Sequence, residues 1–284
     1  MIVPHKLNCV ITCDILNTTF DIDFKGEKMI KVENLRKVYK VGGEKVVALN
    51  NISLHIEKGE FCCIVGTSGS GKSTLLNQLA GLEKPTKGKV KINGQLVSKM
   101  TEKELATFRQ NNIGFIFQSY NLLPTLTAVE NVAFPLLFRG EDRAIREKKA
   151  KKILKDMGLG ERMNHKPGEM SGGQQQRVGI ARAFVGRPKV IFADEPTGNL
   201  DSATTEQVMK MLLEISQQNN ITFVMVTHDP ELAKLAPRVI TLKDGQVVSD
   251  MRNGVSLLEE DMLISQQRSQ EEKQTAIQLR AERQ

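Results

Sequence analysis

The stretch CIVGTSGSGKSTLL, residues 63–76, decides the fold of this chain. An apolar run ends at Val65, Gly and Ser residues follow, and Lys72-Ser73 opens a leucine-rich helical pattern. From Gly66 onward the stretch fits G-x-x-x-x-G-K-[ST] between a strand and a helix, which is the context of a phosphate-binding P-loop. Its glycines let successive backbone N–H groups surround phosphate oxygens, and the helix directs its positive end to the same place. We therefore expect the phosphates of a nucleotide to bind here.

Lys72 and Ser73 have distinct tasks in this motif. The Lys72 ammonium is expected to reach the β- and γ-phosphates, and the Ser73 hydroxyl is expected to bind Mg²⁺. A Gly-rich turn that merely begins a helix is the structural alternative, but all fixed positions and both flanks favour the P-loop. The other residues expected to contact the nucleotide are Gly66, Thr67, Ser68, Gly69, Ser70, Gly71 and Thr74.

A pair of acidic residues follows another apolar run. The sequence VIFADEP, residues 190–196, has four apolar residues and then Asp194 and Glu195. Asp194 is placed to hold Mg²⁺, directly or through water. Glu195 can polarise a water molecule for in-line attack on the γ-phosphate. A solvated acidic turn after a strand explains the pair equally well when it is taken alone.

The sequence MSGGQQQR, residues 170–177, is a more specific signal. Ser171, Gly172 and Gly173 begin a helical pattern that runs through Ala183, which gives a second helix N-terminus suited to an anion. One nucleotide hardly needs two such anion sites from one lobe, and the sequence contains one P-loop. The economical solution is a dimer, in which this helix contacts the γ-phosphate held by the P-loop of the partner.

This stretch closely resembles the Leu-Ser-Gly-Gly-Gln signature of the ATP-binding cassette (ABC) ATPases, with Met170 in place of Leu. The resemblance covers about residues 29–250. It implies an ATPase that uses ATP and Mg²⁺ and has an α/β fold. That fold is a P-loop NTPase (RecA-like) core with a mainly parallel sheet, an antiparallel β subdomain and an inserted helical subdomain at about 119–185. The alternation of strand and helix patterns independently favours a largely parallel sheet.

Further residues match the motifs of this family in the expected order. Gln118 in FIFQSY resembles the glutamine that senses Mg²⁺ and the attacking water, and His228 in VMVTHD resembles the switch histidine at the γ-phosphate. Tyr39 resembles the aromatic residue that stacks on adenine. Gln174 of the signature and Asp201 of the GNLD segment are implied to serve the ATP held by the partner. The resemblance thus implies the catalytic residues Glu195, His228 and Gln118, and the metal-binding residues Ser73, Gln118 and Asp194.

Residues 113–140 are similar to a subgroup of ABC ATPases for lipoprotein release, macrolide export and antimicrobial-peptide resistance. The similarity implies a transporter subunit that forms a homodimer, powers separate integral-membrane permease subunits and binds no nucleic acid. It also implies a cytoplasmic location at the inner face of the cell membrane. Leu122, Leu123 and Leu126 either line the groove for a permease helix or pack in the core of the helical lobe.

Two other functions stay open at the level of sequence. A regulatory ABC ATPase, which drives a membrane partner without moving a solute as in cell division, shares nearly every motif. A soluble cassette, such as one for iron–sulfur assembly, is disfavoured by the similarity in residues 113–140. The sequence of a cassette does not indicate the cargo or the direction of transport, because substrate contacts lie on the permease.

Composition is that of a soluble globular protein: 284 residues, 40% hydrophobic and 26% charged. No stretch reaches the roughly 18–20 uninterrupted apolar residues that cross a bilayer. The net charge of +7 favours nucleotide phosphates, nucleic acid or an anionic membrane face without choosing among them. The neighbours Cys62 and Cys63 are expected to be buried free thiols on a strand.

The two ends of the chain lie outside the resemblance. Residues 1–28 are an N-terminal extension of unknown role, either an appended strand-rich segment or the product of an upstream start codon. Residues 251–284 are expected to be a helical or disordered tail. Between them, patterning predicts strands at 52–56, 61–65, 190–193 and 222–227, helices at 139–157 and 202–216, and a helix-capping box at Thr101 and Glu104.

Overall fold

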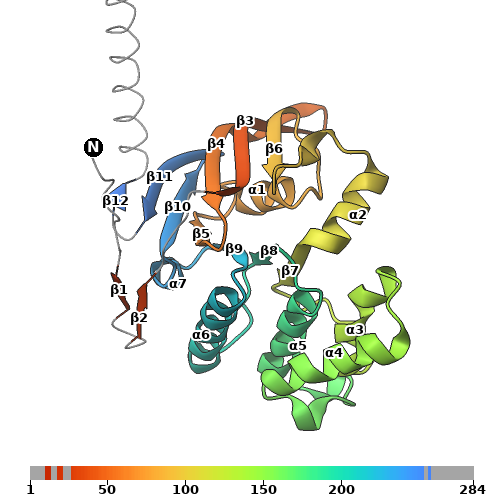
Figure 1. Cartoon of the computed structure of the whole chain (residues 1–284). Coiled ribbons are helices and arrows are strands. Elements are labelled where there is room, and N and C mark those ends of the chain that lie inside the picture. The colour runs from red at the N-terminus through yellow and green to blue at the C-terminus, as the bar shows by residue number, and fades with distance from the viewer. Residues whose placement is uncertain (1–9, 14–17, 22–26, 253–254, 257–284) are drawn as a thin grey trace, which may run out of the picture.

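A largely parallel sheet forms the centre of the molecule in the computed structural model, which describes residues 10–13, 18–21, 27–252 and 255–256 (Figure 1). The strand order is β12-β11-β10-β5-β9-β8-β7. Strands β10, β5, β9, β8 and β7 run parallel, and β11 and β12 add an antiparallel edge. The bounds are β5 (Phe61–Val65), β7 (Ile113–Phe117), β8 (Val190–Asp194), β9 (Thr222–Thr227), β10 (Arg238–Lys243), β11 (Gln246–Arg252) and β12 (Val255–Ser256).

An antiparallel sheet of β3 (Lys28–Val41), β4 (Glu44–Glu57) and β6 (Lys87–Ile92) packs beside this core in the order β4-β3-β6. The implied antiparallel β subdomain is therefore present. Strand β4 is longer than the predicted strand at 52–56, because register shifts in its pairing with β3 interrupt the alternation of apolar residues.

Helices cover the central sheet and build a separate lobe (Figure 1). The lobe contains α3, α4 and α5, which agrees with the helical subdomain expected at about 119–185. The helix predicted at 139–157 begins later than expected, because Gly140, with φ of 72°, separates α3 from α4. The helices are α1 (Lys72–Leu79), α2 (Glu102–Asn112), α3 (Ala128–Phe138), α4 (Arg143–Asp156), α5 (Gly172–Phe184), α6 (Ser202–Gln218) and α7 (Pro230–Lys234), with short 3₁₀ turns at Val97–Lys99, Gly160–Arg162 and Pro167–Glu169.

Strand β5 is buried on both faces, as its continuous apolar run predicts. Phe61 and Cys63 pack into the core shared with the helical lobe, and Cys62 and Ile64 pack into the core shared with the antiparallel sheet. Both thiols are free, and burial raises the pKa of Cys63 to about 12. The prediction of buried free thiols at 62 and 63 is confirmed.

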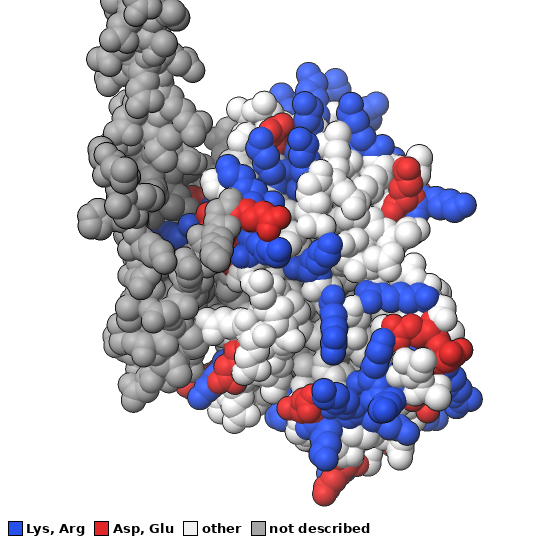
Figure 2. Space-filling view, in the orientation of Figure 1, with Lys and Arg blue, Asp and Glu red and all other residues white. Residues whose placement is uncertain are grey.

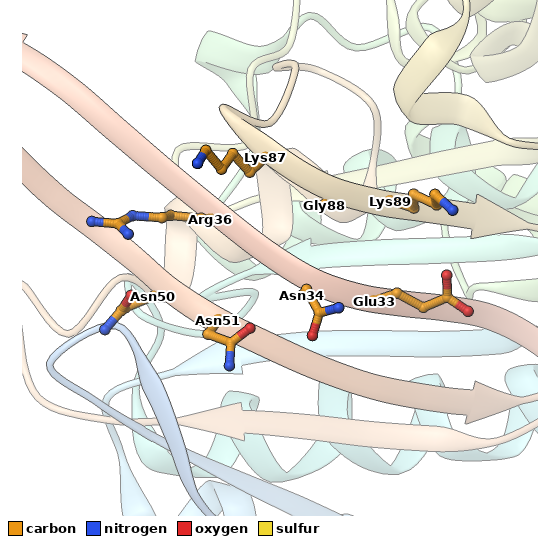
Figure 3. A pocket seen from close by; sticks show the side chains of 8 residues that line it. All are labelled: Glu33, Asn34, Arg36, Asn50, Asn51, Lys87, Gly88 and Lys89. Atoms are coloured by element: carbon orange, nitrogen blue, oxygen red, sulfur yellow. The ribbon is translucent and has the colours of Figure 1, made fainter.

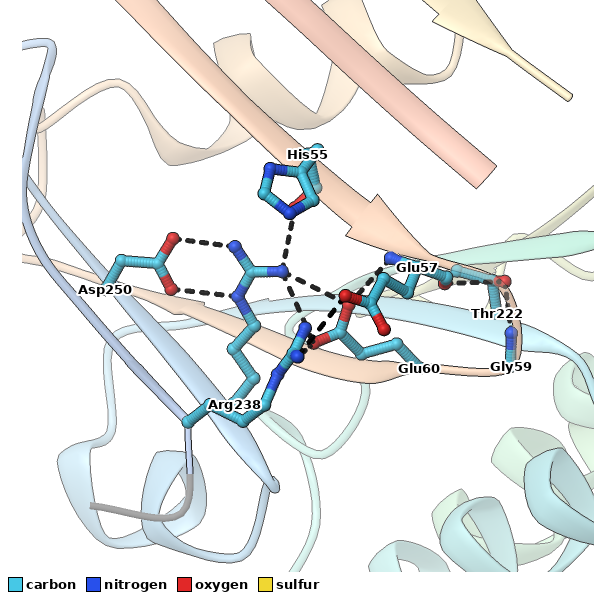
Figure 4. A network of polar contacts seen from close by, with 8 residues as sticks. His55, Glu57, Gly59, Glu60, Thr222, Arg238 and Asp250 are labelled. Carbon is cyan, nitrogen blue, oxygen red and sulfur yellow. Dashed lines mark hydrogen bonds and ion pairs between the residues drawn. The ribbon is translucent and has the colours of Figure 1, made fainter. Parts of the chain in front are cut away.

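A buried network of charges joins the N-terminal ends of β5 and β10 to β11 (Figure 4). The guanidinium of Arg238 donates from Nε and Nη2 to the two oxygens of Asp250 at 2.8 and 2.7 Å. Its Nη1 donates to the His55 carbonyl at 2.7 Å and to Glu60 Oε2 at 3.1 Å. Arg252 Nη2 donates to the other Glu60 oxygen at 2.6 Å. Burial lowers the pKa of Arg238, but these carboxylates outweigh it and raise the pKa.

The extensions are described only in part. Strands β1 (Val10–Cys13) and β2 (Thr18–Asp21) pair antiparallel within the expected N-terminal extension. Strand β11 runs to Arg252, so regular structure passes the boundary expected at residue 250. The helical or disordered tail predicted for 251–284 lies, from residue 257 on, outside the described residues. Among the described helices, none combines the length and the apolar character that a bilayer crossing requires.

Candidate functional site

The P-loop lies between β5 and α1, as its spacing predicts. Lys72 is buried, and its Nζ donates to the carbonyls of Gly66 and Thr67 at 2.8 and 2.9 Å. The ammonium is thus held inside the loop by backbone oxygens. None of the ion pairs among the described residues involves Lys72, so its charge is available for an anion.

The first turn of α1 offers its backbone N–H groups freely. No side chain of a described residue caps this N-terminus, and no acidic residue lies in its first turn. Gly71, with φ of 101°, packs so closely that a Cβ would lie 2.6 Å from the Ala48 carbonyl oxygen. The buried Ser70 Oγ has no hydrogen-bond partner among the described residues. This uncapped loop fits the oxygens of a triphosphate.

Three strand ends bring the other predicted residues to the same edge of the sheet as the P-loop. In the parallel register Phe117 of β7 lies beside Asp194 of β8, and Asp194 lies beside Val226 of β9. Gln118, Glu195 and His228 follow these strand ends directly or within two residues. Residues from four separate parts of the chain therefore meet where parallel strands direct their carboxyl ends.

Asp194 and Ser73 form the candidate metal site. The Ser73 Oγ donates to Asp194 Oδ1 at 3.4 Å, which joins the start of α1 to the end of β8. Burial and the neighbouring charge of Glu195 raise the pKa of Asp194, while Ser73 and Lys72 oppose this rise. A hydroxyl and a carboxylate at this spacing are oxygen ligands of the kind Mg²⁺ prefers, so the residues fit the ion.

Glu195 and His228 contact each other directly. His228 Nδ1 lies 2.8 Å from Glu195 Oε1, and the histidine side chain is 62% exposed while that of the glutamate is 19% exposed. Glu195 has a left-handed backbone with φ of 45°, and its N–H donates to the Val226 carbonyl at 3.0 Å. This strained turn directs the carboxylate out of the sheet edge and toward His228.

Tyr39 lies at the P-loop helix, on strand β3. Its hydroxyl donates to Glu83 Oε2 at 2.6 Å, and the Lys37 ammonium lies 5.0 Å from the centre of its ring. Burial and the Glu83 hydrogen bond raise the pKa of Tyr39, and a hydrogen bond with Thr74 of α1 opposes them. The ring is therefore fixed beside the nucleotide site by contacts that the sequence did not predict.

The signature segment begins α5, in the helical lobe and away from α1 (Figure 1). Ser171 caps the helix, and its Oγ accepts a hydrogen bond from the N–H of Gln174 at 3.3 Å. A Cβ on Gly172 would lie 2.9 Å from the Tyr120 hydroxyl, and one on Gly173 would lie 2.7 Å from a Thr204 methyl. A side chain at either position would therefore have to displace the Tyr120 or the Thr204 side chain. Met170 is buried, as its replacement of an apolar Leu predicts.

Asp201 ends the segment between β8 and α6, and this segment contacts Gln118, which directly follows β7. Asp201 caps α6 through the Thr204 N–H at 3.0 Å, and the Thr204 hydrogen bonds lower its pKa. Asn199 Nδ2 donates to the Gln118 carbonyl at 3.0 Å. The predicted glutamine and the GNLD segment are therefore directly connected.

Sequence reasoning missed Arg182, which joins the Gln118 loop to α5. Its guanidinium donates to the Tyr120 carbonyl at 2.7 Å and also to the Asn121 carbonyl. Those two residues have left-handed backbones, with φ of 60° and 47°. The sequence contained one signal for this contact, an arginine on the largely buried helix α5, and this signal does not indicate which residues the arginine bonds to. Leu122 packs partly against the lobe core, whereas Leu123 is exposed.

Comparisons with known proteins show the family of this chain. The model of the ABC transporter family matches residues 49–198. An ABC transporter ATP-binding protein of Methanocaldococcus jannaschii is 53% identical over 220 residues, which are 78% of this chain and 98% of that protein. The macrolide export ATP-binding/permease protein MacB of Rhodopirellula baltica is 45% identical, over 83% of this chain but only 35% of that protein.

Solved structures give the same result. The dimeric ATP-binding cassette MJ0796 bound to ADP and Pi superposes with a TM-score of 0.74 at 45% identity, covering 79% of this chain and 99% of that chain. Fold and site together define a P-loop ATPase of the cassette type. The chain belongs to the ABC transporter family, as its ATP-binding and ATP-hydrolysing cassette.

Proposed function

We propose that this cassette hydrolyses Mg²⁺-ATP in a dimer and thereby drives separate membrane-spanning permease subunits. The observation that supports it most is the meeting of the P-loop, Asp194, Glu195 and His228 at one sheet edge. Residues 29–252 form the ATPase domain in this proposal. The residues that hold ATP and those that position water come from different strands, so nucleotide binding organises the whole edge.

Each side chain has a role in the reaction. Lys72 and the N–H groups of α1 neutralise the phosphates, and Ser73 with Asp194 would hold Mg²⁺, which supplies charge neutralisation when bound. Glu195 orients and polarises the attacking water, and His228 holds the glutamate through the 2.8 Å contact. Gln118 contributes to the metal site, and Tyr39 stacks on the adenine ring.

The signature helix acts on the ATP of a second copy. Ser171 and the N–H groups of Gly172 and Gly173, which the Ser171 cap does not engage, form a second anion site, and α5 belongs to a different lobe from α1 (Figure 1). Gly172, Gly173, Gln174 and Asp201 serve the same ATP in the partner. The solved cassette MJ0796 is dimeric, which supports this arrangement.

Exposed apolar side chains support a permease partner. Leu123, which follows the Gln118 loop, Leu82 and Phe138 are 39%, 45% and 65% exposed. Hydrogen bonds from Arg109 to the Gly81 carbonyl and from Gln110 to the Phe138 carbonyl connect the segments of Leu82 and Phe138 through α2. Exposed apolar side chains of this kind suit a helix of a membrane subunit.

The membrane partner also decides between transport and regulation. Similarity to MacB, whose name describes macrolide export, favours a transporter of that subgroup at the inner face of the membrane. A regulatory cassette remains the second candidate, because it uses the same site. Co-purification with a permease that has a large extracytoplasmic domain supports transport, and a permease without one supports regulation.

The shared-site mechanism is tested with Glu195→Gln. This variant should bind ATP normally, lose about 10²–10⁴-fold in turnover, and form a stable dimer with Mg²⁺-ATP. Dimer formation is measured by light scattering during gel filtration. Replacing Ser171 with Arg in the same background should abolish the dimer while ATP affinity stays within about twofold of the parent. A Glu195→Gln protein that stays monomeric at saturating ATP contradicts the proposal.

A further inference from the structure

A surface cavity of about 420 Å³ lies on the antiparallel sheet, apart from the P-loop (Figure 3). Three cationic side chains and three side-chain amides line most of it. They come from all three strands of the sheet: Asn34 and Arg36 of β3, Asn50 and Asn51 of β4, and Lys87 and Lys89 of β6.

The backbone shapes this cavity. Asn34 and Asn51 have left-handed conformations, with φ of 49° and 56°, at interruptions of the β3–β4 ladder. Gly88, with φ of 95°, approaches β3 so closely that a Cβ would lie 2.5 Å from the Asn34 carbonyl oxygen. The Asn34 N–H donates to Ser53 Oγ at 2.9 Å. The main chain therefore fixes the positions from which the lining side chains extend.

Like charges face each other across the cavity. Arg36 and Lys87 are direct partners in the β3–β6 register, and Figure 3 shows their side chains extending to the same side. Two cations directly opposite each other destabilise a sheet, unless an anion lies between them. None of the ion pairs among the described residues involves Arg36, Lys87 or Lys89. An anion in the cavity would therefore relieve this repulsion.

Among the described residues that line the cavity, the single carboxylate is already engaged. Glu33 lies opposite Lys89 in the register, but its carboxylate is paired with Lys31 at 2.5 Å. That hydrogen bond is the main reason why the pKa of Glu33 is lowered. The cavity thus keeps an excess of positive charge. Figure 2 shows Lys and Arg gathered over the end of the molecule that carries these strands in Figure 1.

We propose that this cavity binds a phosphate group, either in a phospholipid head group or as free phosphate. The Arg36 fork can donate two parallel hydrogen bonds to a phosphate, and Lys87 and Lys89 add charge. The amides of Asn34, Asn50 and Asn51 supply neutral donors that fix its orientation. The site goes beyond the ATPase function, and it can fail while that function stands.

The test follows the side-chain amide signals of the three asparagines in ¹⁵N-labelled protein during titration with inorganic phosphate. We expect saturable shifts, and at least tenfold weaker binding when Arg36→Gln and Lys87→Gln are combined. The control combines Lys103→Gln and Lys148→Gln, which removes the same charge from exposed sites on α2 and α4. Its binding should equal that of the wild type. Signals of the P-loop residues report the nucleotide site separately.

Vesicles distinguish the two sources of the phosphate. Sedimentation with phosphatidylcholine vesicles containing phosphatidic acid, lost in the Arg36→Gln and Lys87→Gln protein alone, assigns the site to a lipid head group. Saturable phosphate shifts without vesicle binding assign it to soluble phosphate. The proposal is overturned if neither occurs, if sodium chloride at equal ionic strength causes the same shifts, or if the control protein loses binding equally.

Discussion

The N-terminal and C-terminal edges of the parallel strands differ in how far their buried charges are compensated. At the N-terminal edge Arg238 is bonded to Asp250 and Glu60, so the buried charges compensate one another within the chain. At the C-terminal edge Asp194 lies beside Glu195 and has a raised pKa. At the first edge, residues of the protein itself compensate the buried charge of Arg238. At the second edge, a triphosphate and a cation are needed to compensate the charges of the site.

This difference separates stability from activity. A buried ion pair with all its hydrogen bonds made is costly to break, because the remaining partner keeps its desolvation penalty. An incompletely compensated site stores unfavourable interactions that a ligand relieves. Substitutions at the N-terminal edge should therefore affect folding, and substitutions at the C-terminal edge should affect ATP.

The largest effect on folding is expected for Arg238→Ala. The free energy of unfolding should fall by about 3–5 kcal/mol, because Asp250 loses its buried partner and Glu60 loses one of two. Urea denaturation measures the change. Lys243→Ala, on an exposed position of the same strand, is the matched control and should change it by less than about 0.5 kcal/mol. If both variants lost the same free energy of unfolding, the buried charge network would not contribute specially to stability.

The next effect concerns ATP binding. Lys72→Ala should weaken ATP about 10–100-fold, because charged hydrogen bonds of about 1.5–3 kcal/mol are lost. Isothermal titration calorimetry with ATP measures the affinity. Stability should change little by comparison, since within the described parts of the chain the ammonium is hydrogen-bonded to the carbonyls of Gly66 and Thr67 and to no carboxylate. Unchanged affinity would show that the loop does not grip phosphate through this residue.

The smallest effect is a gain in stability from Asp194→Asn. Burial and Glu195 raise the pKa of Asp194, so the folded state binds its proton more tightly than the unfolded state does. Ionisation therefore costs stability, fully above the folded pKa and not at all below the unfolded value near 3.8. Near neutral pH the variant should melt about 2 °C higher, although it no longer holds Mg²⁺.

The pH dependence of the melting temperatures tests this explanation of the Asp194→Asn effect. The advantage of the Asp194→Asn variant should shrink as the pH falls through the raised pKa toward the ordinary value, because the wild-type carboxyl then becomes neutral too. Differential scanning calorimetry of the nucleotide-free proteins at several pH values records it. A gap that widens in acid would reverse the sign of the argument.

Local patterns in the sequence predicted the features that depend on neighbouring residues. The P-loop, the apolar run before Asp194 and the capping box at Thr101 and Glu104 each lie within one short segment, and each is present in the structure. The largely parallel sheet was also predicted, and the site residues meet at one edge of it because parallel strands direct their carboxyl ends alike. The roles of Glu195 and His228 in catalysis stay predictions until they are measured.

Features that depend on contacts between distant residues could not be predicted from the sequence. Tyr39 meets Glu83, and Arg182 meets the carbonyl of Tyr120, through packing that no local pattern encodes. Strand β10 and the buried Arg238 were missed for the same reason, because a charged residue at the start of a strand normally indicates solvent. Burial of a charge becomes visible only when its partners are in place.

The position of β5 between β9 and β10 has a consequence for synthesis of the protein on the ribosome. Phe61 pairs with Phe223, and Cys62 pairs with Arg238, so the strand that carries the P-loop meets its neighbours late. At ribosomal speeds of about 5–20 residues per second, β9 and β10 are synthesised on the order of 10 s after β5. During that interval an apolar strand lacks the two strands that flank it in the fold, and exposed apolar segments of this kind are prone to aggregation.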